Sequence, residues 1–137
     1  MNSKWYLFLN ESKMVWKKPD FKSELNEFKR VAKEKDINLK DLKKAYDSAE
    51  LVFLEKNFWK KIENTDSWET TTREKAEAVA KKHNRNIDRI YNNIHGEMDA
   101  PIVLINGNDP PTLVSGNTRL MVCRVMGIQP DIVLIKI

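Results

Sequence analysis

The chain has 137 residues, of which 41% are hydrophobic and 32% charged, and this length suits a single domain. Four glycines and five prolines are too few for a disordered or linker-rich chain, and no apolar run approaches the roughly 20 residues needed to cross a bilayer. The single cysteine, Cys123, excludes an internal disulfide framework and a multi-cysteine zinc site. With only two histidines, no structural metal site is expected. We expect a cytoplasmic protein with no signal peptide and no membrane partner.

The net charge of +4 is spread along the chain and forms no basic block. This near-balance argues against sequence-independent DNA binding, which needs several phosphate contacts. Charge density changes sharply near residue 100, because residues 1–100 carry 39 charged side chains and residues 101–137 carry five. The sequence therefore predicts an α+β fold, with a helical N-terminal region before a small mixed α/β sheet. We divide it into a helical accessory region, residues 1–70, and a second domain, residues 71–137, packed together as one compact unit.

The first elements are predicted from apolar spacing. Residues 4–9, which contain the apolar run Trp5–Leu9, are typical of a short strand, and the following residues make an extended connection that ends at Pro19. Asp20 can cap a helix, and Asn38 can cap a second, longer helix that continues to Ile62. The lysines of this second helix indicate a solvated face rather than a binding site.

The next segment has the form of a capping box, Thr71-Thr72-Arg73-Glu74, and predicts a helix that ends at Gly96. Its middle, residues 83–86, is rich in weak helix formers and can break the helix in two.

The signals then change to β structure. Residues 101–105 are typical of a buried strand, residues 106–111 of a turn, and residues 112–114 of a second strand, which together predict a hairpin. A helix is expected over Asn117–Met126, stopped by Gly127, followed by a last strand over residues 131–137.

The stretch Leu113-Val114-Ser115-Gly116-Asn117-Thr118-Arg119-Leu120 runs from a strand through a glycine into a helix. The N-terminus of a helix presents free amides and a positive dipole end, which favour an anion, and a glycine lets a phosphate approach the backbone. The short polar side chains and the arginine fork add hydrogen-bond donors. Taken alone, Gly-x-x-Arg is a weak pattern, and a capped helix with a surface arginine explains it as well.

The order of elements over roughly the last 50 residues resembles the ParB/sulfiredoxin superfamily. The resemblance is carried by Ile94-His95-Gly96, then Pro101-Ile102-Val103, the glycine turn with Arg119, Met126-Gly127-Ile128 and Ile132-Val133-Leu134. It implies a fold that binds nucleotide phosphates at the turn from Gly116 to Arg119. In relatives this turn serves binding and hydrolysis of CTP or ATP, nuclease activity, or phosphotransfer.

The chain also departs from its relatives. Sulfiredoxins carry a reactive cysteine and a histidine before the arginine, where this chain has Asn117 and Thr118, so reduction of a sulfinic acid is not expected. Cys123 lies one helical turn further on and is interpreted as a small residue at the edge of the core. We expect neither the helix-turn-helix nor the dimerisation tail of chromosome-partitioning ParB proteins.

The leading hypothesis is a nucleoside triphosphate site made by Ser115, Gly116, Asn117, Thr118 and Arg119, with Mg²⁺ accompanying the nucleotide. Arg119 is the candidate catalytic residue, since it could neutralise charge on a transferred phosphoryl group during hydrolysis, phosphotransfer or DNA cleavage. Glu97 and Asp99 are candidate Mg²⁺ ligands and His95 a candidate general base, although a polar loop and a helix end are the favoured interpretations.

The alternative hypothesis is a non-catalytic interaction protein on the same fold, for example a regulator or inhibitor from a phage or mobile element. Its partner, a protein or DNA, would bind the helical N-terminal region.

Overall fold

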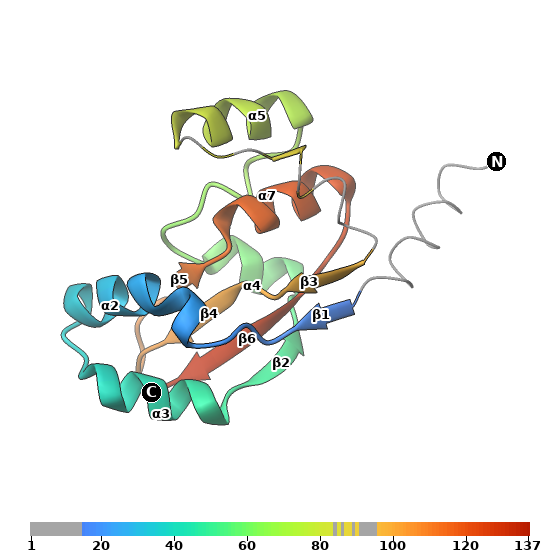
Figure 1. Cartoon of the computed structure of the whole chain (residues 1–137). Coiled ribbons are helices and arrows are strands. Elements are labelled where there is room, and N and C mark those ends of the chain that lie inside the picture. Colours follow the sequence, from blue (N-terminus) through green and yellow to red (C-terminus); the bar gives the residue numbers. More distant parts are fainter. Residues whose placement is uncertain (1–14, 84, 86, 89, 91–95) are drawn as a thin grey trace.

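The computed structural model describes residues 15–83, 85, 87, 88, 90 and 96–137 (Figure 1). In chain order the elements are β1 (Val15–Lys17), the 3-10 turn η1 (Lys22–Glu24), α2 (Leu25–Glu34), α3 (Leu39–Ser48), β2 (Glu50–Phe53), α4 (Lys56–Lys61), α5 (Arg73–Lys82), β3 (Glu97–Asp99), β4 (Ile102–Ile105), β5 (Thr112–Ser115), α7 (Asn117–Met126) and β6 (Asp131–Lys136). The predicted α+β class, with helices before a small mixed sheet, is confirmed.

A four-stranded sheet has the order β2-β6-β4-β5. β4 and β6 run parallel in its centre, and β5 and β2 pair antiparallel on either side of them. A separate two-stranded sheet joins β1 to β3 in parallel. Strands from the first half of the chain thus pair with strands from the second half in both sheets.

Helices cover both faces of the larger sheet and divide the core into two clusters. On one face, α2 and α3 contribute Phe28, Leu42 and Tyr46 to the cluster around Ile102 and Val133. On the other face, α4, α5 and α7 contribute side chains to a second cluster; among them are Trp59, Ala76, Ala80, Leu120 and Met121. In Figure 1, α7 lies between α5 and the strands, while α2 and α3 lie at the opposite side.

The elements predicted for the last 37 residues are confirmed. β4 and β5 form the expected hairpin, and β6 forms the last strand. α7 spans the predicted residues and ends at Gly127, whose φ of 71° is a left-handed conformation that favours glycine.

The predicted long helix after Asn38 is wrong in its second half. Asn38 caps α3 as expected, because its side chain accepts from the amide of Lys40 at 2.8 Å, but the helix ends at Ser48 and β2 follows. Lys18 lies at this end and donates from Nζ to the carbonyl oxygens of Tyr46 and Ala49 at 2.6 and 2.8 Å. An ammonium group at the C-terminus of a helix donates to the last carbonyl oxygens, which have no acceptor role left inside the helix. The helix can therefore end at Ser48, and the next residues pair with β6 as β2.

Two predicted helix starts are displaced. Asp20 does not cap an α-helix: residues 22–24 form a 3-10 turn, and α2 begins at Leu25 with no side-chain cap. Thr72, rather than Thr71, caps α5 by accepting from the amide of Lys75. The helix predicted to reach Gly96 ends at Lys82, next to residues 83–86, where the sequence indicates a break, and most of its predicted second half lies outside the described residues.

The strand predicted for residues 4–9 lies outside the described residues. Within the described ranges, no helix is long and apolar enough to span a membrane.

Candidate functional site

The glycine turn joins β5 to α7 in a conformation that only glycine accepts readily. Gly116 has a φ of 108°, and a Cβ atom at this position would lie 2.8 Å from the Cα of Pro101. Gly116 is also the N-cap of α7, and no side chain caps it. The first hydrogen bond of the helix runs from the amide of Leu120 to the carbonyl oxygen of Gly116 at 2.9 Å. The amides of residues 117–119 therefore have no hydrogen-bond acceptor within the helix.

A cleft of about 660 Å³ opens over this turn. Its charged lining comes from both halves of the chain: Glu24, Glu27, Arg30, Arg85 and Arg119. Its apolar lining includes Val79, Ala80, Leu113 and Met121. A cleft of this size, lined by both polar and apolar groups, is typical of a small-molecule site.

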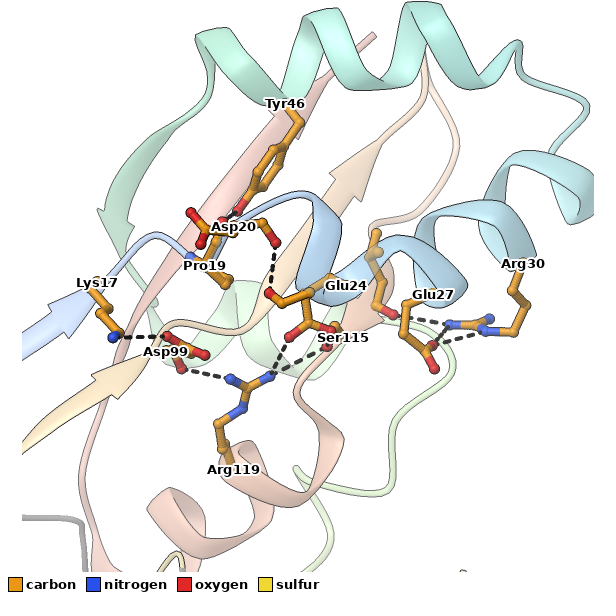
Figure 2. Close-up of polar contacts among 12 residues, drawn as sticks. Lys17, Pro19, Asp20, Glu24, Glu27, Arg30, Tyr46, Asp99, Ser115 and Arg119 are labelled. Atoms are coloured by element: carbon orange, nitrogen blue, oxygen red, sulfur yellow. Dashed lines mark hydrogen bonds and ion pairs between the residues drawn. The ribbon is translucent and has the colours of Figure 1, made fainter.

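Arg119 lines the cleft and its side chain is 16% exposed. Its Nη1 donates to the carbonyl oxygen of Asp99 at 3.0 Å, and its Nη2 donates to the hydroxyl of Ser115 at 3.3 Å and lies 3.8 Å from Oε1 of Glu24 (Figure 2). Burial lowers the pKa of Arg119 below its ordinary value, while the carboxylates of Glu24 and Asp99 act in the opposite direction. The guanidinium remains a cation at neutral pH.

Ser115 and Glu24 connect the turn to α2. The Ser115 hydroxyl donates to Oε2 of Glu24 at 2.8 Å, so this carboxylate binds both the serine and the guanidinium of Arg119. Figure 2 shows Glu24 and Arg119 pointing toward each other from opposite elements, with Ser115 beside them. Ser115 and Arg119 lie together, as the sequence predicts. In the structure, however, both already contact Glu24 of the same chain.

Asn117 faces a neighbouring loop. Its Oδ1 accepts from the hydroxyl of Thr65 at 2.7 Å and from the amide of Asp66 at 3.2 Å. Thr118 is only 5% exposed, although it lines the cleft. Both residues lie at the turn between β5 and α7, and the side-chain oxygen of Asn117 holds the loop that follows α4.

Arg30 is a second arginine in the lining of the cleft. Its Nη2 donates to the carbonyl oxygen of Val114 at 3.0 Å, which ties α2 to β5. The same guanidinium binds Glu27 at 2.9 Å and Glu34 at 3.2 Å. With Arg85 and Arg119, the cleft holds three arginines against Glu24 and Glu27, so its charged lining is net positive.

Glu97 and Asp99 lie on β3 and not in a polar loop as the sequence indicated. Their carboxylates flank Lys17 of β1, with Nζ at 3.5 and 3.8 Å from them. An ammonium group between two carboxylates opposes their use as Mg²⁺ ligands. Among the described residues there is no group of three or more histidine, cysteine or acidic side chains that could hold a metal ion.

Cys123 is fully buried in α7, deeper than the edge of the core that the sequence indicated, and burial raises the pKa of its thiol to about 12. A protonated thiol without access to solvent is a poor nucleophile. His95, the candidate general base, lies outside the described residues.

Glu24, Glu27 and Arg30 were missed by the sequence prediction. They repeat every three residues and therefore lie along one side of the chain entering α2. That spacing also describes an ordinary solvated helix face, and nothing in the sequence joins it to a turn some 90 residues away.

No family model, no curated protein and no solved structure matches the chain.

Proposed function

We propose that the chain binds a nucleoside triphosphate in the cleft over the turn from Gly116 to Arg119. The observation that carries the proposal is the uncapped N-terminus of α7 opening on a cleft with three arginines. Free helix amides and guanidinium groups are the donors that phosphates bind best. The resemblance of the last 50 residues to the ParB/sulfiredoxin superfamily supports the same ligand.

In this proposal the phosphates lie against Gly116, where no Cβ obstructs their approach, and the amides of the first turn of α7 donate to them. The base lies toward the apolar lining, which includes Val79 and Met121. Arg119 is the residue that would stabilise charge on a transferred phosphoryl group. To do so its guanidinium has to exchange its contact with Glu24 for a phosphate oxygen.

Magnesium would enter with the nucleotide. Mg²⁺ commonly keeps several waters and binds phosphates plus one or two carboxylates, so it needs no preformed cage. Glu24 and Glu27 are the hard oxygen donors of the cleft lining, and each would have to exchange its contact with an arginine for the metal. Hydrolysis, phosphotransfer and DNA cleavage are the reactions that the resemblance implies for such a complex.

The test is calorimetric titration with ATP, CTP, GTP and ADP, each with and without Mg²⁺. We expect saturable binding that Arg119→Ala abolishes. Arg124→Ala is the matched control, because Arg124 lies on the same helix but contacts Trp68 outside the cleft. Absence of heat with every nucleotide, or equal loss in both variants, would reject the phosphate site.

A second candidate is a non-catalytic interaction protein on the same fold. The observation that favours it is that the guanidinium of Arg119 already contacts Asp99, Ser115 and Glu24 of its own chain, which leaves it less available to a phosphate. If the titrations show no binding, this candidate predicts that immobilised protein captures a partner and that Arg119→Ala leaves capture unchanged. Charge reversals on the exposed face of α3, such as Lys40→Glu and Lys44→Glu, would then abolish capture.

A further inference from the structure

β2 is an edge strand of the larger sheet, and all four of its residues are exposed. Three of them are large and apolar: Leu51, Val52 and Phe53, the last of which is 59% exposed. Natural proteins usually protect such an edge with charged residues, proline or a covering segment, because its free peptide groups attract another strand. The middle of β2 has none of these protections in its sequence.

The pairing of β2 with β6 shows which peptide groups of β2 point away from the sheet. The amide of Leu54 donates to the carbonyl oxygen of Pro130 on the β6 side at 3.0 Å. In an antiparallel pair every second residue repeats this bonding, so Val52 also binds β6. The N–H and C=O groups of Leu51 and Phe53 consequently point away from the sheet.

We propose that β2 pairs antiparallel with β2 of a second copy of this chain, around a two-fold axis at Val52. In that register Leu51 lies opposite Phe53 of the second copy, and the reverse. Both residues of each pair have outward peptide groups, so the two strands exchange N–H···O bonds without a shift. Such an interface is self-complementary, as two-fold interfaces must be, and joins the two four-stranded sheets into one.

The apolar side chains also match in this register. Leu51 of each copy meets Phe53 of the other on one face of the joined sheet, and the two Val52 side chains meet on the opposite face. Cross-strand pairs of aromatic and aliphatic side chains stabilise antiparallel strands. Every large apolar residue exposed on β2 is therefore covered by another from the same strand.

Charge complementarity favours a second copy over an unrelated peptide. Glu50 precedes the apolar residues and Lys56 follows them, at the start of α4; both side chains are exposed. When β2 is turned around Val52, Glu50 lies opposite Leu54 of the second copy, and Lys56 follows two residues later at the start of α4, so the opposite charges lie at the same end of the paired strands. Within the described ranges neither residue has an ion-pair partner in its own chain.

The first experiment is sedimentation velocity over a wide concentration range. We expect a concentration-dependent dimer for the unmodified chain and a monomer for Phe53→Lys, since a lysine would face an apolar partner and another lysine diagonally nearby. Val15→Lys is the matched control, because Val15 is 58% exposed and lies on the other sheet. It should still dimerise. Thermal unfolding of each variant verifies that it is folded.

A charge exchange tests the register. Glu50→Lys and Lys56→Glu should each weaken the dimer, and the double variant should restore it. Loss of the dimer in all three variants would overturn the proposed pairing. A monomeric unmodified chain at every concentration would overturn the proposal itself.

Hydrogen exchange separates a second copy from other occupants of the edge. We expect the amides of Leu51 and Phe53 to become protected as the concentration rises, while Val52 is protected throughout. Protection of Leu51 and Phe53 in a chain that sediments as a monomer would mean that another segment of the same chain covers β2. Protection only on addition of a different protein would identify an external strand, and either result overturns the proposal.

Discussion

A Cβ atom on Gly116 would lie 2.7 Å from the Cβ of Pro101. This contact joins the start of α7 to the residue that precedes β4, so the backbone of the turn can lie against the sheet only if position 116 carries no side chain. The left-handed φ of 108° adds a second reason for glycine.

Gly116→Ala should therefore destabilise the fold strongly. The clash with Pro101 and the strained φ together predict a loss of about 3 kcal/mol in the free energy of unfolding, measured by urea denaturation. Gly107→Ala is the control, because Gly107 also has a positive φ, of 58°, but has no atom within 4 Å of the added methyl group. Its loss should be about 1 kcal/mol, from backbone strain alone. Equal losses in the two variants would show that the contact with Pro101 contributes nothing.

The elements after residue 100 could be predicted from the sequence because local and long-range signals agree there. The hairpin has a dense turn, and α7 has glycines at both ends, so each boundary has a physical cause within a few residues. Burial on both sides of β4 matches its unbroken apolar composition.

β2 could not be predicted because the apolar residues in and before it fit both the spacing of a helix and that of a strand. Leu42, Tyr46, Ala49 and Phe53 fit a helical stripe, and the same run of apolar residues fits a strand. What decides between them is the open edge of β6 and the side chain of Lys18 at the end of α3. Both are distant in the sequence.

The candidate site likewise has one part that the sequence predicts and one part that it does not. Its turn is local, and the sequence pattern finds it. Its opposite wall, with Glu24 and Arg30, depends on the packing of α2 against β5, which is a tertiary contact. The sequence consequently indicated a free Arg119, whereas the structure pairs this residue with Glu24.

Glu24→Gln tests whether this pairing competes with a phosphate. The amide can keep a hydrogen bond to Ser115 but carries no charge, so Arg119 gives up less when it binds a nucleotide. We expect the affinity for a nucleoside triphosphate to rise about tenfold, or about 1.4 kcal/mol, in calorimetric titration. Glu77→Gln, an exposed carboxylate on α5, removes the same charge outside the cleft and should change the affinity little. Weaker binding in Glu24→Gln would instead assign the carboxylate a direct role in the complex.

Alkaline unfolding should report on Cys123. Burial raises the pKa of its thiol from 9.0 to about 12, so the folded chain keeps this proton after the unfolded chain has lost it. The resulting stabilisation is complete below pH 9 and is lost between pH 9 and 12. Within this window, the free energy of unfolding should fall by up to about 1.4 kcal/mol per pH unit more steeply than in Cys123→Ala. Parallel slopes in the two proteins would mean that the thiol reaches solvent in the folded state.

Asn117→Asp separates the fold of the turn from its affinity for anions. An aspartate keeps the acceptor for Thr65 and Asp66, and its charge is favourable in the first turn of α7. We expect the free energy of unfolding to change by less than about 1 kcal/mol, while triphosphate binding weakens by about tenfold or more because two anions meet at the helix N-terminus. Asn117→Ala gives the opposite result: it should lose about 1 kcal/mol of stability with the loop contacts and keep most of the affinity. If the aspartate variant binds nucleotide as tightly as the unmodified chain does, the phosphates do not lie at this end of α7.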